Sequence, residues 1–74
     1  MFETVKELII EQSGTTPELI TLEASLVDDL DVDEIDLSEL IMALEVEFDI
    51  QIPDDAIEST KTVRDILTLI EARI

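Results

Sequence analysis

Apolar residues recur at helical spacing close to the amino terminus of the chain. These positions are Phe2, Val5, Leu8 and Ile9. Gly14 follows them, at a place where a left-handed residue would end a helix. We therefore predict a first amphipathic helix over residues 2–13.

A long connection separates this helix from the next periodic segment. Pro17 fixes φ near its start, so residues 15–18 predict a short turn or helical start. Residues 18–32 show no helical period, and a structureless loop of this length is uncommon in a small domain. We expect its apolar side chains to anchor the segment to the core. They are Ile20, Leu22, Leu26 and Leu30.

A second helix is predicted over residues 34–48. Asp33 is a candidate N-cap, and Asp36 stands three residues on, as in a capping box. Residues 50–53, which include Pro53, are expected to end this helix. Its apolar stripe comprises Leu37, Leu40, Ile41, Leu44 and Phe48.

Two further helices are predicted towards the carboxyl terminus. A short helix over residues 54–57 opens after Pro53 with acids in its first turn. The last helix begins at Thr62, which pairs with Asp65 as in a capping box. Its inward residues are Val63, Ile66, Leu67, Ile70 and Ile74. Because no β alternation competes, we predict an all-α bundle of three main helices and one short helix, in a single domain of residues 1–74.

Composition restricts the chemistry of this bundle. The absence of Cys and His excludes disulfides, zinc sites, Cys nucleophiles and imidazole general bases, so we expect no enzyme acting alone. Only Phe2 and Phe48 are aromatic, so the core should be aliphatic and base-stacking surfaces are lacking, which argues against nucleic-acid binding. With no signal peptide and no apolar run long enough to span a membrane, a cytoplasmic location is expected.

Acidic residues dominate the charge. Twenty acids face four bases, giving a net charge of −16, and no base occurs between Lys6 and Lys61. Thirteen of the acids fall within residues 28–58. A solvated face that keeps the protein in solution is the simplest interpretation. Recognition by a basic partner surface is the better one, because crowded acids repel one another and reduce stability.

The spacing of Asp29, Asp31 and Asp33 resembles the start of a calcium-binding loop. The remainder of that loop is missing, since Glu34 stands where it needs Gly and Leu40 where it needs Glu. We therefore expect no dedicated metal site, and only weak binding of divalent cations by these three aspartates.

Segments along the whole chain resemble acyl carrier proteins. They include residues 28–30 (Asp-Asp-Leu), 39–45 (Glu-Leu-Ile-Met-Ala-Leu-Glu), 47–50 and 52–54 (Ile-Pro-Asp). The resemblance implies a monomeric four-helix carrier of fatty-acid or polyketide synthesis, with 4'-phosphopantetheine as the family cofactor. It also implies that the second helix docks onto basic surfaces of synthase, acyl ligase or transferase enzymes. The matching docking positions are Asp33, Asp36, Glu39, Met42, Glu45 and Glu47. For Met42, ordinary packing in the core or at its rim is the alternative.

Several positions depart from the family pattern. Glu34 replaces the serine that bears phosphopantetheine, and its carboxylate cannot act for the hydroxyl that displaces phosphoadenosine phosphate from coenzyme A. Asp31 replaces a glycine of the same motif, and Val46 stands where an acid is common. Ser38 and Thr60 occupy positions where the acyl cleft is usually aliphatic, and buried hydroxyls there would need hydrogen-bond partners.

Three hypotheses follow from these departures. The first is an acyl-carrier-like module that partner enzymes recognise but that cannot carry the arm at Glu34. The second is a working carrier with the arm on Ser38, although transferases need an exposed hydroxyl at a helix start and Ser38 lies inside a predicted helix. The third is an acidic ion-binding or regulatory protein. We prefer the first, because the companion changes at Asp31, Ser38 and Thr60 favour natural divergence over a single laboratory substitution.

Overall fold

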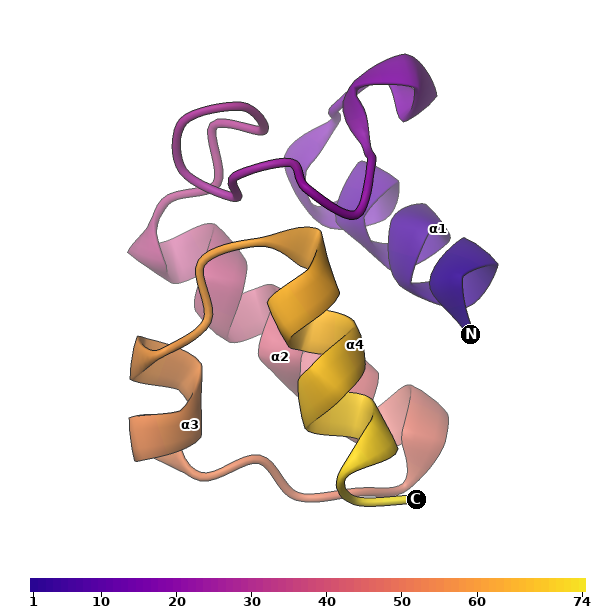
Figure 1. Ribbon diagram of the computed structural model, residues 1–74, viewed down its shortest axis with the longest axis vertical. Helices are drawn as coiled ribbons and strands as arrows, with labels where there is room; N and C mark the ends of the chain where they lie inside the picture. Colours follow the sequence, from indigo (N-terminus) through magenta and orange to yellow (C-terminus); the bar gives the residue numbers. More distant parts are fainter.

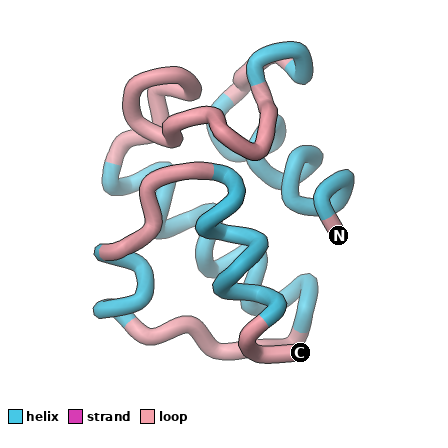
Figure 2. Tube along the Cα trace, viewed as in Figure 1, coloured by secondary structure: helices cyan, strands magenta, loops and turns pink.

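A computed structural model describes all 74 residues as a bundle of four α-helices (Figure 1). The helices are α1 (Phe2–Ser13), α2 (Glu34–Phe48), α3 (Asp54–Glu58) and α4 (Val63–Glu71), and a 3₁₀ turn, η1 (Pro17–Leu19), follows α1. Figure 2 shows helices joined by loops and no strand, which confirms the predicted all-α bundle. None of these helices combines the length and the apolarity needed to cross a membrane.

Helix α1 ends at the glycine that the sequence places after it. Gly14 has a φ of 71°, in the left-handed region that glycine adopts without steric cost, and its N–H donates to the Ile10 carbonyl (2.9 Å). Val5 and Ile9, one turn apart on the inner face, are completely buried. The helix packs against α2 through this face.

Apolar side chains anchor the long connection before α2. Ile20, Leu26 and Leu30 are at most 3% exposed, as predicted. The prediction for Leu22 is wrong, because Leu22 lies in a turn that leaves its side chain half-buried and outside the core. Ala24 is buried in its place.

Backbone hydrogen bonds tie the same connection to the start of α4. The N–H of Leu26 donates to the Lys61 carbonyl (3.0 Å), and the N–H of Arg64 donates to the Leu22 carbonyl (2.9 Å). An isolated antiparallel β-bridge lies between these two bonds. Backbone hydrogen bonds to a segment far along the chain therefore hold the connection in place. They explain how a loop of this length is accommodated in a small domain.

Helix α2 has an aspartate at each end. The Asp33 carboxylate accepts the N–H of Asp36 (2.8 Å), which confirms Asp33 as the N-cap, but the reciprocal bond of a capping box does not form. At the other end Asp49 has a φ of 54° and its N–H donates to the Glu45 carbonyl. Asp49, and not residues 50–53, ends the helix, because Asp is one of the few residues that adopt the left-handed region.

Helix α4 starts with the predicted capping box. The N–H of Asp65 donates to the Thr62 hydroxyl (3.3 Å), and the N–H of Thr62 donates to the Asp65 carboxylate (3.0 Å). The predicted inward position of Ile74 is wrong, since its side chain is 68% exposed. The helix ends at Glu71, so the helical period that would direct Ile74 inward is lost before it.

The core is aliphatic, as the composition predicts. Fourteen apolar residues form one buried cluster, and both phenylalanines lie outside it. The cluster comprises Val5, Ile9, Ile20, Ala24, Leu26, Leu30, Val32, Leu40, Ile41, Leu44, Ile52, Val63, Ile66 and Ile70. Of the predicted stripe on α2, Leu37 and Phe48 pack at the edge of this cluster. Burying one Val, Leu or Ile side chain contributes about 1.5–3 kcal/mol, so the cluster is the main source of stability.

Candidate functional site

The first turn of α2 presents Glu34 at the surface. Glu34 is the first helical residue, and its side chain is exposed next to the N-cap Asp33. A carboxylate at this place is favoured by the helix dipole by about 0.3–1 kcal/mol. The side chain has no hydroxyl, however, so it does not fit the phosphodiester link through which a phosphopantetheine arm is held.

Two adjoining hollows open at this end of α2. The first has a volume of about 340 Å³ and is lined by Leu26, Val27, Val32, Asp33, Glu34, Leu37 and Thr60. The second has a volume of about 440 Å³ and is lined by Val27, Glu34, Leu37, Ser38, Ile57, Glu58, Thr60 and Lys61. Because Glu34 lines both, it lies where the two hollows meet.

The two hydroxyl residues expected near an acyl cleft both line a hollow. Thr60 is buried, and its hydroxyl donates to the Ala56 carbonyl (3.0 Å), so it has the partner that burial requires. Ser38 is exposed in the second turn of α2, one turn beyond Glu34. Only Ser38 therefore presents a free hydroxyl at this site.

Asp31 adopts a backbone conformation that favours glycine. Its φ is 56°, in the left-handed region, where L residues are strained, Asn and Asp less than the others. Val32, two residues before Glu34, is buried. The turn that leads into α2 thus keeps a glycine-like geometry although no glycine is present.

The acidic residues of α2 differ in their availability to a partner. Asp33, Glu39 and Glu47 are exposed, and Asp36 is half-buried. Glu45 is also half-buried, and its carboxylate accepts the N–H of residue 52 (2.8 Å). Glu45 therefore fixes the segment that follows α2, a structural task that its predicted docking role did not include.

The outer face of α2 also carries apolar side chains, and of these only Met42 was expected at a docking surface. Met42 is 64% exposed, which excludes core packing for this residue. Ile35 and Val46 are 70% and 84% exposed. The signal that could have found them is their spacing, since they lie seven residues before and four residues after Met42 and so share its face.

The aspartates of the candidate calcium loop do not form a metal site. No group of three or more His, Cys, Asp or Glu side chains is placed to hold an ion. The Asp29 carboxylate instead accepts the Ser25 N–H (2.7 Å), and Asp33 caps α2. The expected weak binding of divalent cations at Asp29, Asp31 and Asp33 therefore has no preformed site.

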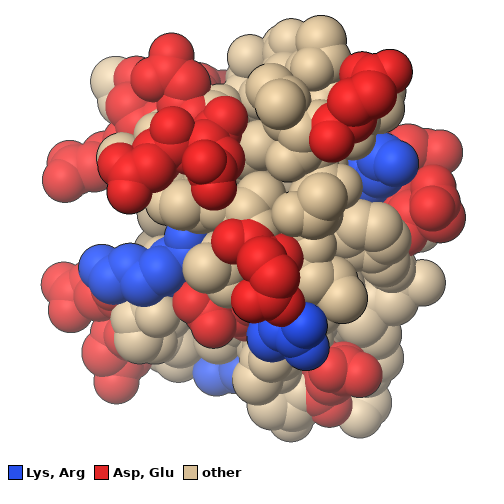
Figure 3. Space-filling view, turned by 45° about the horizontal axis from the view of Figure 1, so that its top comes forward, with Lys and Arg blue, Asp and Glu red and all other residues tan.

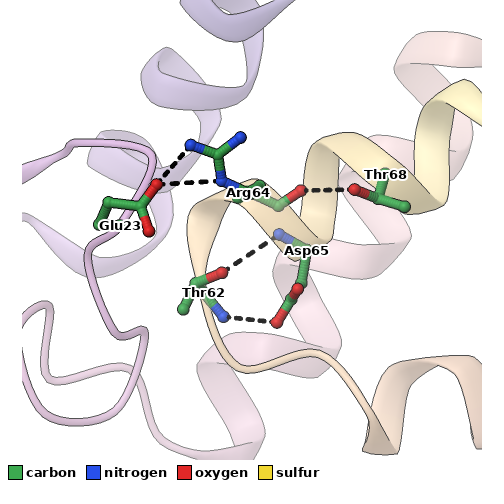
Figure 4. A network of polar contacts seen from close by, with 5 residues as sticks. All are labelled: Glu23, Thr62, Arg64, Asp65 and Thr68. Carbon is green, nitrogen blue, oxygen red and sulfur yellow. Dashed lines mark hydrogen bonds and ion pairs between the residues drawn. The ribbon is translucent and has the colours of Figure 1, made fainter.

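The start of α4 borders the second hollow through Lys61. The Lys61 N–H donates to the Asp65 carboxylate (2.8 Å), and this bond, with those from Thr62, lowers the pKa of Asp65 below 3.8 despite partial desolvation. Beside them Arg64 forms an ion pair with Glu23, with 3.0 Å between Nε and Oε1 (Figure 4).

Figure 3 shows that acidic side chains gather at the upper left of the face drawn, whereas the basic ones are few and separate.

Known proteins are similar to this chain in both sequence and fold. Residues 3–70 match the family model described as a phosphopantetheine attachment site. Acyl carrier proteins of Bdellovibrio bacteriovorus and Phenylobacterium zucineum are each 46% identical to it, over 93% and 100% of this chain and 88% and 94% of theirs. A solved structure assigned as an acyl carrier protein of Mycobacterium tuberculosis is similar with a TM-score of 0.89 and 37% identity, covering 96% of this chain and 95% of that one. The apo doublet acyl carrier protein from prodigiosin biosynthesis gives a TM-score of 0.83 at 28% identity, over 97% of this chain and 35% of that one.

Proposed function

Because the chain belongs to the acyl carrier protein family, whose members are carriers and not enzymes, we propose that it is a carrier-like module with an altered arm site. Partner enzymes recognise it, but it does not hold 4'-phosphopantetheine at the family's usual position. The domain concerned is the whole of residues 1–74. One observation carries the proposal: Glu34, the first residue of α2, is exposed where the two hollows meet.

The chemistry of attachment supports this proposal. The family link is a phosphodiester through a hydroxyl oxygen, and Glu34 offers only carboxylate oxygens. A carboxylate joined to phosphorus would form an acyl phosphate, a mixed anhydride that water hydrolyses. An enzyme that docks at this end of α2 therefore meets a negative charge in place of a nucleophile.

Recognition is proposed to use the acids of α2. Asp33, Glu39 and Glu47 are exposed, and the chain as a whole carries a net charge of −16. Such a field attracts a basic surface and orients it before contact. The partners are accordingly basic faces of synthase, acyl ligase or transferase enzymes in fatty-acid or polyketide-type biosynthesis.

A second candidate is a working carrier whose arm is attached to Ser38. Its support is the exposed Ser38 hydroxyl, which lines the same hollow as Glu34. Its weakness is position, because Ser38 lies in the second turn of α2, away from the helix start at which the family is modified. Both candidates predict docking through α2, and they differ only in whether an arm is attached.

Intact mass measurement separates the two candidates. The purified chain is incubated with coenzyme A and a broad-specificity phosphopantetheinyl transferase. We expect no mass gain for the unaltered chain or for Glu34→Ala, which removes the charge without adding a hydroxyl. Glu34→Ser should show a complete mass gain of one phosphopantetheine group.

Two outcomes would overturn the proposal. A mass gain of one phosphopantetheine group in the unaltered chain would do so, and loss of that gain in Ser38→Ala would assign the arm to Ser38. A folded Glu34→Ser variant that stays unmodified, while a Ser-bearing acyl carrier protein is modified in the same tube, would show that the partner-binding scaffold is not preserved.

A further inference from the structure

The first hollow beside α2 has a largely apolar interior and an acidic mouth. Of its lining residues, Leu26, Val32 and Thr60 are 1%, 4% and 6% exposed, so they form its inner wall. Asp33 and Glu34 are exposed and stand at its opening. Its volume of about 340 Å³ lies within the range of small-molecule sites, which are mostly apolar with a few polar groups that orient the ligand. The hollow therefore suits a molecule with an apolar tail and a polar head.

The polar side chains around this hollow accept hydrogen bonds and do not donate into it. The Thr60 hydroxyl gives its one proton to the Ala56 carbonyl (3.0 Å), so only its oxygen lone pairs are left. An ionised carboxylate only accepts, and one oxygen of Asp33 already accepts the N–H of Asp36. The Glu34 carboxylate is the exposed acceptor that remains. A head group that fits these side chains must therefore donate hydrogen bonds.

The charge at the mouth selects a cation among the possible donors. Glu34 has no basic partner, because the only ion pair of the chain joins Glu23 to Arg64. The helix dipole favours negative charge at this end of α2, but Asp33, Glu34 and Asp36 already supply it. A further anion would be repelled by these carboxylates, whereas a primary ammonium brings three donors and one positive charge.

The second hollow has a different chemistry, although Glu34 lines it as well. Lys61 also lines the second hollow, and its side chain is exposed and forms no ion pair. The Lys61 ammonium repels a cationic ligand and competes with it for the carboxylate of Glu34. The first hollow therefore accepts a cation more readily than the second.

We propose that the first hollow binds a free primary alkylamine, with its alkyl tail against Leu26 and Val32 and its ammonium on the carboxylate of Glu34. Binding is non-covalent, so it needs no hydroxyl at residue 34. The inference goes beyond the proposed function, because it concerns a small molecule and no partner enzyme. Burial of the tail supplies most of the affinity, and the exposed ion pair selects the head group.

Three ligands with the same eight-carbon tail test the inference. Octylamine, octanol and octanoate differ in the charge of the head group, and the amine is protonated at pH 7. Titrated by calorimetry, octylamine should bind at a single site, about threefold more tightly than octanol and at least about tenfold more tightly than octanoate. Hexylamine should bind roughly tenfold more weakly than octylamine, since it buries two methylenes fewer.

Two variants with opposite expected effects separate this site from a general attraction to an acidic chain. Glu34→Gln should weaken octylamine binding about three- to fivefold and leave octanol binding unchanged. Lys61→Gln should strengthen octylamine binding by up to about threefold, a gain that misfolding could not produce. Glu71→Gln is the matched control, because it removes the same charge from an exposed residue at the end of α4 that lines neither hollow. It should bind octylamine as the unaltered chain does.

Nuclear magnetic resonance then locates the tail. Octylamine should shift the methyl signals of Leu26 and Val32, which a ligand reaches only by entering the first hollow. Shifts confined to exposed acidic residues would overturn the inference. Equal affinity for octylamine and octanoate, equal weakening by Glu34→Gln and Glu71→Gln, or weaker binding by Lys61→Gln would overturn it as well. None of these results affects the proposed function, which the mass measurement decides.

Discussion

The starts of α2 and α4 leave the same backbone N–H groups without helical partners and satisfy them in different ways. At α4, Thr62 and Asp65 bond each other's N–H groups, and Asp65 also accepts the N–H of Lys61. At α2, Asp33 accepts one N–H and Glu34 stays exposed. One helix end is closed by its own side chains, and the other keeps its acids facing solvent.

This difference separates the part of the chain that stabilises the fold from the part that we propose is recognised. The start of α4 is also paired with residues 22–26 through backbone bonds, so its cap supports two segments at once. The start of α2 borders both hollows and carries Asp33, one of the proposed docking acids. Acids that remain in solvent contribute less to stability but stay available to a basic partner.

Removing the α4 cap should produce the largest loss of stability. The double variant Thr62→Ala/Asp65→Ala loses both reciprocal bonds, and we expect a decrease of about 2 kcal/mol in the free energy of unfolding. For a domain of this size that corresponds to a fall of roughly 8–16 °C in Tm. Urea and thermal denaturation followed by circular dichroism measure both quantities.

The matched variant at the other helix is Asp33→Ala, which removes one exposed bond. It should cost at most about 1 kcal/mol. A loss at α2 as large as that at α4 would contradict the contrast between the two helix starts.

A change at Asp31 tests the turn that leads into α2. Asp31→Gly relieves the backbone strain at a left-handed position with a φ of 56° and should raise the free energy of unfolding by up to about 1 kcal/mol. Asp31→Ala removes the same charge but keeps the strain, so it should be less stable than the glycine variant by about 1 kcal/mol. Urea midpoints that coincide for the two variants would show that backbone strain plays no part there.

The elements that local patterns predict are the ones whose ends depend on local bonds. The end of α1 and the start of α2 follow from Gly14 and Asp33, whose effects lie within one turn. The errors depend on distant or rare geometry. Leu22 is displaced by a turn beside the strand-like pairing with α4, and Ile74 follows a helix that ends early. Asp49 ends α2 in a left-handed conformation that no local pattern distinguishes.

The candidate site divides in the same manner. The place of Glu34 in the first turn of α2 was predicted from the family resemblance together with the N-cap. The exposed positions of Ile35 and Val46 were not predicted, because a helical apolar period predicts the side chains that face the core and these two lie on the opposite face of α2. The bond from the N–H of Ile52 to Glu45 joins positions seven residues apart around a helix end, so helical spacing alone does not predict it.

Lowering the pH should reduce the difference in stability between the unaltered chain and Asp65→Asn. Hydrogen bonds hold the pKa of Asp65 below 3.8 in the folded chain, so the carboxylate stabilises the fold above that pH. This contribution is lost as the pH falls through the folded pKa. The gap in urea midpoint should be widest and constant above about pH 5 and should narrow below about pH 4. The difference in stability should be smaller than the loss in the double cap variant, because the Asn oxygen can still accept a hydrogen bond. A difference in urea midpoint that does not depend on pH would contradict the lowered pKa of Asp65.

The smallest effects are expected for the ion pair between Glu23 and Arg64, and they should be unequal. Its side chains are 75% and 58% exposed, and such pairs contribute less than about 1 kcal/mol. Glu23→Gln loses the pair but also removes one acid from a chain with a net charge of −16, so we expect a change near zero. Arg64→Gln loses the pair and one of only four bases, so it should cost up to about 0.5 kcal/mol at low salt. Salt at about 0.1 M screens charges beyond about 10 Å and should shrink this difference. If both variants lose the same free energy of unfolding and salt does not reduce the loss, the ion pair itself stabilises the start of α4. The contrast with α2 would then depend on the ion pair as well as on the cap.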